Sequence, residues 1–125
     1  MLVSGLKVSA SMPLVIPVSF QELLDRMPRG AQNVLVSLGG DGALLCAEDG
    51  RRLYQPAPDG TVIGTVGAGD STVAGFVAGW HRYGDMAEAL RLGVACGSAT
   101  AFSEGLADQA VIAAVLATMP EMIEV

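Results

Sequence analysis

The pattern of apolar and polar positions is weak at the beginning of the chain and becomes regular further on. Residues 1–19 show no clear period, so they are expected to be irregular, with strand character at residues 14–16. Apolar positions then recur at helical spacing over residues 20–27, which predicts a short amphipathic helix. Pro28 and Gly30 end that helix.

The middle of the chain has the pattern of buried strands. Residues 33–38 form an apolar run, and the glycine-rich stretch from Gly39 to Gly42 closes it, as at the end of a buried strand. Residues 43–47 and 52–55 flank a Glu-Asp-Gly turn, so they are predicted to form a hairpin.

The second half of the chain is mainly helical in pattern. A short strand is expected at residues 61–63, followed by a glycine-rich turn at residues 64–69. Three helices are then predicted, over residues 70–82, 86–102 and 109–119. Tyr83-Gly84-Asp85 and Gly105 separate them, and Asp108 caps the third helix.

This order of elements predicts an α/β fold with a partly parallel sheet. The 125 residues fit one compact domain or a piece of one, and no internal repeat or linker divides them. Apolar residues make up 51% of the chain and aromatic residues 5%, so the core is expected to be aliphatic. The 16 glycines predict that backbones pack closely in that core.

The charge and the cysteine pattern argue against some classes of function. The formal net charge is −6 and the seven basic residues are scattered, which argues against nucleic acid as a partner. Cys46 and Cys96 belong to no metal-binding or redox pattern, and two buried free thiols fit a reducing cytoplasm. No apolar run is long enough for a membrane span, so no membrane partner is expected and the protein is predicted to be cytoplasmic.

The stretch TVGAGDSTVAGF, residues 65–76, carries the candidate chemistry. A glycine-rich turn that opens a helix presents unpaired N–H groups and the positive end of the helix dipole, and this combination binds anions. Gly67, Ala68 and Gly69 leave space for a phosphate or a developing oxyanion. Asp70 then has two interpretations: it is the base that takes the proton of an attacking hydroxyl, or Asp70 or Ser71 only caps the helix.

The stretch SLGGDG, residues 37–42, is a second glycine-rich turn after a strand. Its expected place is the same edge of the sheet as the first turn, where open α/β sheets bind ligands. Two such turns at one edge favour a nucleotide site, although a plain connection between a strand and a hairpin explains this second turn equally well. Neither turn matches the P-loop or the GxGxxG fingerprint.

Small residues recur at helical spacing in the two helices that follow. Ala74, Gly75, Ala78 and Gly79 in the first helix, and residues 95–99 in the second, predict close packing of helix backbones. The lone histidine, His81, lies near a helix end, where interaction with the helix dipole is its expected role.

Taken together, the two glycine-rich stretches resemble the C-terminal part of the ribokinase-like, or PfkB, carbohydrate kinases. TVGAGDSTVAGF resembles that family's second signature, and VLVSLGGDGALL resembles the strand and turn before it. The form with Thr-Val before GAGD and Ser after it is most similar to 1-phosphofructokinases and tagatose-6-phosphate kinases. The resemblance runs from about Gln32 to Glu104.

This resemblance implies ATP-dependent phosphorylation of a sugar phosphate, either fructose 1-phosphate or tagatose 6-phosphate. Asp70 would be the catalytic base, and Mg²⁺ would arrive with ATP, bridging its phosphates. Gly67, Ala68 and Gly69 would supply the anion hole. Ser37, Gly39 and Gly42 would lie beside the ATP phosphates, and the helix segment from Ala95 to Ser98 would lie near the adenine.

The resemblance also implies that residues 1–125 are one partial nucleotide-binding and catalytic domain. Nothing in the sequence corresponds to the family's N-terminal sugar-binding half or to its small β lid. Gly64 stands where relatives that bind a monovalent cation have an acid, which argues against such a site. The alternative hypothesis is a non-catalytic α/β remnant that binds nucleotide or forms a homo-oligomer through an exposed sheet edge.

Overall fold

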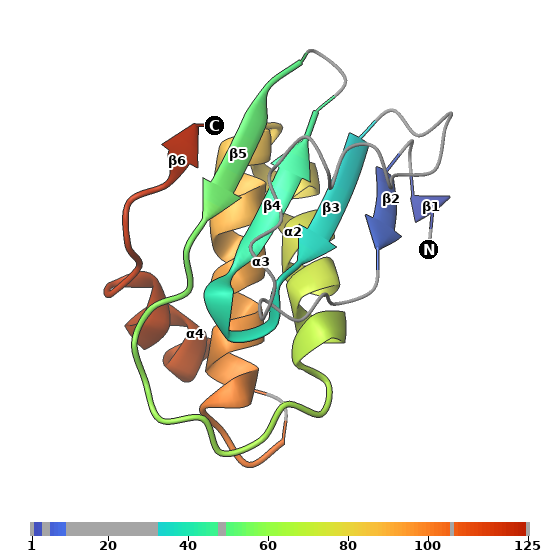
Figure 1. Cartoon of the computed structure of the whole chain (residues 1–125). Coiled ribbons are helices and arrows are strands. Elements are labelled where there is room, and N and C mark those ends of the chain that lie inside the picture. Colours follow the sequence, from blue (N-terminus) through green and yellow to red (C-terminus); the bar gives the residue numbers. More distant parts are fainter. Residues whose placement is uncertain (1, 4–5, 10–32, 48–49, 106, 125) are drawn as a thin grey trace.

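The computed structural model describes residues 2–3, 6–9, 33–47, 50–105 and 107–124. Within them a six-stranded sheet is covered on one face by two long helices (Figure 1). The helix expected at residues 20–27 and the strand character at residues 14–16 lie outside the described residues.

The sheet has its strands in the order of the sequence, β1 to β6. Only β2 and β3 run parallel among the described strands, and the other neighbours are antiparallel. The expectation of an irregular start was wrong for β1 and β2, which pair with each other and, through β2, with β3. The strands are β1 (Leu2–Val3), β2 (Leu6–Ser9), β3 (Asn33–Ser37), β4 (Ala43–Cys46), β5 (Arg52–Gln55) and β6 (Ile123–Glu124).

The central strands bury side chains on both faces, as their continuous apolar pattern predicts. Leu35, Leu45 and Leu53 point toward the helices and pack in one cluster with the helix residue Phe76. On the opposite face, side chains of alternate positions form a second buried cluster: Val34, Val36, Leu38 and Leu44. The predicted strand at residues 33–38 and the predicted hairpin are therefore confirmed.

The three described helices are α2 (Ala68–Tyr83), α3 (Met86–Ala101) and α4 (Gln109–Leu116). Gly84 ends α2 in the left-handed conformation, and its N–H bonds to the Trp80 carbonyl. Asp85 then caps α3 by accepting hydrogen bonds from two backbone N–H groups, and Asp108 caps α4 in the same way with one. The predicted break at Tyr83-Gly84-Asp85 and the predicted cap at Asp108 are confirmed, and Asp85 is a cap that the sequence pattern did not assign.

Glycines let α2 and α3 approach each other closely. A Cβ atom on Gly75 would lie 2.8 Å from the Cys96 Sγ, and one on Gly79 would lie 2.8 Å from the Ala89 Cα. These distances are too short for a real side chain, so the contact depends on glycine at both positions. The predicted close packing is confirmed on this face of α2, whereas Ala74 and Ala78 are exposed.

Several elements differ from the prediction, and among them α2 begins at Ala68 instead of residue 70 and α3 ends at Ala101 instead of residue 102. Residues 61–63 form no strand; the chain is extended there, but the Ile63 and Gly64 N–H groups bond to the Ala101 carbonyl at the end of α3 instead of to a neighbouring strand. Helix α4 ends at Leu116, before the predicted residue 119, in turn-type bonds such as Thr118 N–H to the Val115 carbonyl. No helix within the described part of the chain combines the length and the apolar character needed to cross a membrane.

Candidate nucleotide and phosphoryl-transfer site

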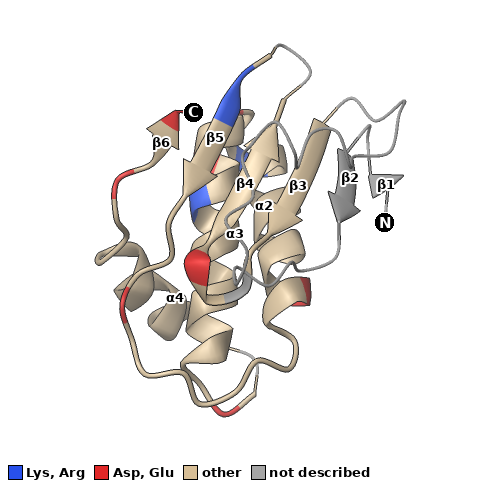
Figure 2. Ribbon diagram, in the orientation of Figure 1, with Lys and Arg blue, Asp and Glu red and all other residues tan. Residues whose placement is uncertain are grey.

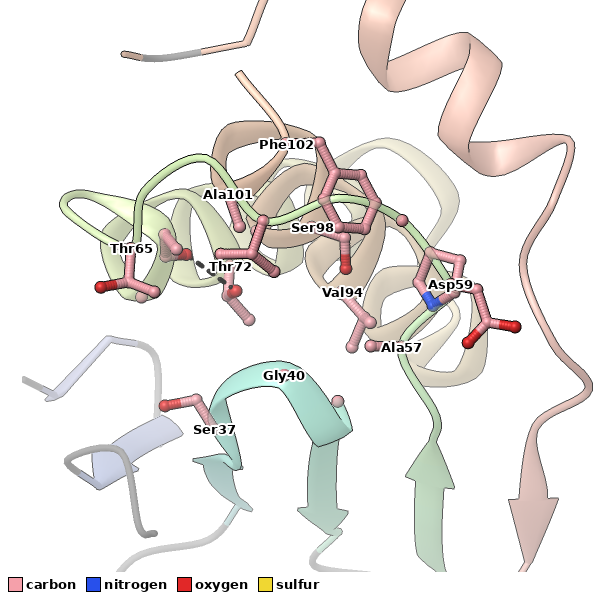
Figure 3. A pocket seen from close by; sticks show the side chains of 17 residues that line it. Ser37, Gly40, Ala57, Asp59, Thr65, Thr72, Val94, Ser98, Ala101 and Phe102 are labelled. Carbon is pink, nitrogen blue, oxygen red and sulfur yellow. Dashed lines mark hydrogen bonds between the residues drawn. The ribbon is translucent and has the colours of Figure 1, made fainter. Parts of the chain in front are cut away.

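A pocket of about 280 Å³ lies where the β3–β4 turn, the loop after β5, the beginning of α2 and the last turns of α3 come together (Figure 3). Segments far apart in the sequence thus form a single cavity at one end of the sheet. Its lining residues are Ser37, Gly40, Gly42, Ala57, Pro58, Asp59, Gly60, Val62, Thr65, Ala68, Gly69, Thr72, Val94, Gly97, Ser98, Ala101 and Phe102.

The first turn of α2 has unpaired backbone donors beside this pocket. Gly67 is the N-cap residue, with φ of 83°, and no side chain caps the helix. The Ala68 N–H bonds to the Thr65 carbonyl at 3.2 Å and the Ser71 N–H to the Gly67 carbonyl at 2.9 Å. Within the described part of the chain, the N–H groups of Gly69 and Asp70 have no acceptor. The helix dipole adds partial positive charge at the same place.

Asp70 lies on this turn with its side chain exposed to solvent. Its carboxylate makes no hydrogen bond or ion pair with any described residue. The alternative in which Asp70 or Ser71 caps α2 was therefore wrong, because the N-cap is a glycine and the Ser71 hydroxyl bonds to Thr100 instead. The carboxylate is free to accept a proton from a hydroxyl brought to the edge of the pocket.

The second glycine-rich turn is held in place by its neighbours. Residues 39–41 form a single 3-10 turn, closed by the Leu38 N–H bonding to the Gly42 carbonyl at 2.8 Å. The Tyr54 hydroxyl donates to the Asp41 carbonyl at 2.5 Å. Burial, and secondarily the negative charge of Asp41, raise the pKa of Tyr54, so the hydroxyl keeps its proton and remains a donor.

Gly42 is fixed by both conformation and space. Its φ is +99°, and a Cβ atom there would lie 1.9 Å from the Gln55 carbonyl oxygen and 2.9 Å from the Ala57 nitrogen. Only glycine allows the turn to lie this close to the end of β5. Gln55 in turn donates from Nε2 to the Pro120 carbonyl at 3.0 Å, which ties the same region to the C-terminal segment.

The end of the pocket away from the α2 N-terminus is more apolar. Val94, Ala57 and Phe102 lie together there in Figure 3, with the Asp59 carboxylate beside them. The Phe102 ring packs on Gly60, where a Cβ atom would lie 2.4 Å from the ring. An apolar slot next to an anion-binding turn suits a ligand with a flat ring at one end and phosphates at the other.

Among the lining residues that the structure describes, none is Lys or Arg. In Figure 2 the described Lys and Arg residues lie near the β4–β5 hairpin and in the middle of the molecule, whereas Asp and Glu residues lie both near the pocket end and toward the C-terminus. No group of three or more potential metal ligands occurs within the described residues.

The structure brings most of the predicted site residues to this pocket. Ser37, Gly42, Ala68, Gly69 and Ser98 line it, while Gly67 and Asp70 flank the lining residues of the α2 turn and Gly39 flanks Gly40.

Ala95 lies elsewhere. It is fully buried in a cluster with Ala99 and Val115 of α4, because the helical period turns it away from Val94 and Ser98. Ala95 therefore does not line the pocket, and its place beside a bound ring stays a prediction.

Residues 57–60 and Phe102 form one side of the pocket, and the sequence did not predict them as site residues. The Pro-Asp-Gly composition of that loop indicates a turn and carries no signal for a ligand. Phe102 was predicted only as the last residue of a helix. Its ring reaches the pocket because α3 ends one residue earlier, at Ala101.

Comparison with known proteins places the chain in a family of carbohydrate kinases. Residues 12–112 match the pfkB family of carbohydrate kinases, and the chain belongs to this family. The 1-phosphofructokinase of Bacillus subtilis is 51% identical over 78 residues, which cover 62% of this chain and 25% of that protein. The D-tagatose-1-phosphate kinase of Bacillus licheniformis is 47% identical over 88 residues, 70% of this chain and 28% of that protein.

Solved structures confirm the ribokinase-like α/β fold. The ribokinase of Arabidopsis thaliana, complexed with ribose and ATP, superposes with a TM-score of 0.67 at 27% identity, over 77% of this chain and 32% of the ribokinase chain. The chain thus spans about a quarter to a third of the length of the relatives it matches.

Proposed function

We propose that this chain carries the phosphate-binding and proton-accepting part of a kinase that transfers the terminal phosphoryl group of ATP to a hydroxyl of a sugar phosphate. The observation that carries the proposal is the exposed Asp70 carboxylate beside the unpaired N–H groups of the α2 N-terminus, at the edge of a pocket. A carboxylate and an anion hole side by side are what this reaction needs from the protein.

The role that we propose for each residue follows from its position at the pocket. Asp70 accepts the proton of the acceptor hydroxyl as that oxygen attacks the phosphorus atom. The N–H groups of Gly69 and Asp70 stabilise negative charge that develops on the phosphoryl oxygens, with Gly67 and Ala68 providing room for them. The turn at Ser37, Gly39 and Gly42 adjoins the remaining phosphates of ATP, and the slot near Ser98 and Phe102 receives the adenine ring.

Mg²⁺ fits this site as part of the Mg–ATP complex. Among the described residues, no basic side chain lines the pocket to offset the charge of a triphosphate, and no carboxylate cluster would hold the ion by itself. Bound together with ATP, Mg²⁺ would supply the charge compensation that the described lining residues lack.

For the acceptor we propose fructose 1-phosphate or a tagatose phosphate. The support is that relatives 51% and 47% identical are named 1-phosphofructokinase and D-tagatose-1-phosphate kinase. Because the chain spans only about a quarter of those proteins, we expect it to bind ATP weakly and to give little turnover without further sugar-binding residues.

Calorimetric titration with Mg–ATP, and with ATP in EDTA, tests the nucleotide assignment. We expect saturable heat with Mg–ATP and much weaker binding in EDTA. No heat from a chain whose circular dichroism shows it to be folded would refute the assignment. Transfer from [γ-³²P]ATP to each candidate sugar phosphate is measured in parallel.

Asp70→Asn separates the base from a purely structural role. The variant keeps the shape of the side chain but cannot accept the proton, so any transfer should fall about 10²- to 10⁴-fold. Mg–ATP affinity should stay the same or rise, because a negative charge beside the phosphates is removed. Unchanged transfer would rule out Asp70 as the base.

A second candidate function, a non-catalytic module that associates with itself, is favoured by the exposed apolar side chains beside the site. Val66 is 92% exposed, and Val62 and Ile63 are also exposed. Light scattering coupled to size-exclusion chromatography checks it: a concentration-independent monomer contradicts this function, and a stable oligomer that transfers no phosphate supports it.

A further inference from the structure

Hydroxyl groups connect the first turn of α2 to the last turn of α3. The Thr100 side chain is 3% exposed, and its Oγ1 lies 2.9 Å from the Ser71 Oγ in a hydrogen bond. Thr100 Oγ1 also accepts a longer bond from the Ala107 N–H at 3.4 Å. Because Ser71 directly follows Asp70, the Ser71–Thr100 bond fixes the turn that carries the proposed base.

A second contact between the same two turns leaves no space for a side chain. Thr72 Oγ1 donates to the Ala68 carbonyl at 3.0 Å, the bond drawn in Figure 3. Gly97 of α3 lies directly against this pair: a Cβ atom there would be 2.0 Å from Thr72 Oγ1 and 3.0 Å from the Ala68 oxygen. Any side chain at position 97 would push the α2 turn away from α3.

The loop that leads into the α2 turn is attached to the same place. The Ala101 carbonyl accepts from the Ile63 N–H at 2.8 Å and from the Gly64 N–H at 3.2 Å. One turn of α3 thus contacts the segment before Gly67 and the helix turn after it.

We propose that Ser71 and Thr100 are positioning residues, which hold the α2 N-terminus in the geometry that leaves the Gly69 and Asp70 N–H groups unpaired and directed to solvent. Neither residue touches the reacting atoms in this scheme; both act through the turn they hold. The consequence for phosphate binding rests on the function proposed above, whereas the consequence for the turn itself does not.

The ligand-free test is amide hydrogen exchange measured by NMR on Ser71→Ala. Loss of one partly buried hydrogen bond should speed exchange of the Ser71 and Thr72 amides about 3- to 10-fold, with the Phe76 amide in the middle of α2 unchanged. Thr100→Val should have the same local effect. The double variant should exchange these amides no faster than the single variant with the larger effect, because both changes remove the same bond.

Ser103→Ala is the matched control. It removes a hydroxyl bond of similar length, Ser103 Oγ to the Ala99 carbonyl at 2.7 Å, from the same end of α3 without involving α2. We expect it to leave the Ser71 and Thr72 amides unchanged. Equal acceleration in Ser71→Ala and Ser103→Ala, acceleration spread evenly along α2, or strictly additive single variants would each overturn the proposal.

Ligand binding tests the link to function with a different readout. Ser71→Ala should weaken Mg–ATP binding about 3- to 10-fold and leave AMP binding unchanged, because AMP lacks the phosphates that reach the α2 turn. Thr100→Ser, which keeps the hydroxyl, should restore the parent affinity that Thr100→Val loses. Equal losses for ATP and AMP would overturn the link. If the parent chain binds neither nucleotide, the proposed function fails while the exchange result still decides the role of the two hydroxyls.

Discussion

Replacing Gly42 with alanine tests whether the β3–β4 turn depends on glycine for the reason the structure gives. Two separate costs are expected. Holding a residue with a Cβ at φ of +99° costs about 1–3 kcal/mol. The methyl group would also lie 1.9 Å from the Gln55 carbonyl oxygen, and the movement of backbone needed to relieve that overlap costs about 1–3 kcal/mol more.

The total for Gly42→Ala is therefore about 2–6 kcal/mol. A chain of this length has a free energy of unfolding of roughly 6–19 kcal/mol, so the variant should still fold. Its Tm should fall by roughly 6–20 °C. Urea unfolding followed by circular dichroism, together with a thermal scan, measures both quantities.

Gly40→Ala is the control in the same turn. Gly40 has no positive φ, and a Cβ atom there would meet nothing within 4 Å. Its free energy of unfolding should stay within about 0.5 kcal/mol of the parent. If the two variants were equally stable, or equally destabilised, the close approach of Gly42 to β5 would not be the reason for glycine there.

Two further predictions concern helix capping and pH. Asp85→Ala removes the acceptor of the Ala87 and Glu88 N–H bonds and should lower the free energy of unfolding by about 1 kcal/mol, measured by urea titration. Asp85→Asn keeps an oxygen acceptor and should retain most of the stability that this cap contributes. Equal losses in the two variants would contradict the capping role. Burial raises the pKa of Cys96 above its ordinary 9.0, so the unfolded chain releases this proton first; the contribution of this thiol to stability should be constant below about pH 9 and fall above it. The fall should be smaller in Cys96→Ala, and an identical fall would show that this thiol is not responsible.

Local signals predicted the elements whose ends are determined locally. Gly84, Asp85 and Asp108 fix helix boundaries through their own conformations and side-chain bonds, so their residue types were sufficient. The hairpin was equally readable because β4 and β5 are adjacent in sequence. The GAGD turn could be placed at the beginning of a helix from its glycines and the helical pattern after it.

What sequence analysis missed depends on distant partners. Strand β2 exists because it pairs with β3, and β6 because it pairs with β5, and neither short segment carries a pattern of its own. The stretch at residues 61–63 has strand-like composition, but its N–H groups meet the Ala101 carbonyl of a helix. The direction of Ala95 was missed because neighbouring small residues leave several faces of α3 equally suited to close packing.

The described lining of the pocket contains no basic side chain, and this has a kinetic consequence for the proposed nucleotide. A nucleotide anion approaching a protein of net charge −6 through an opening with acidic neighbours is repelled at long range. Dissolved salt screens that repulsion, so encounter should become faster as ionic strength rises, opposite to the usual behaviour of anion sites lined with lysine and arginine. Capture would then depend on short-range contact with the peptide amides, and a ligand already neutralised by its metal would enter most readily.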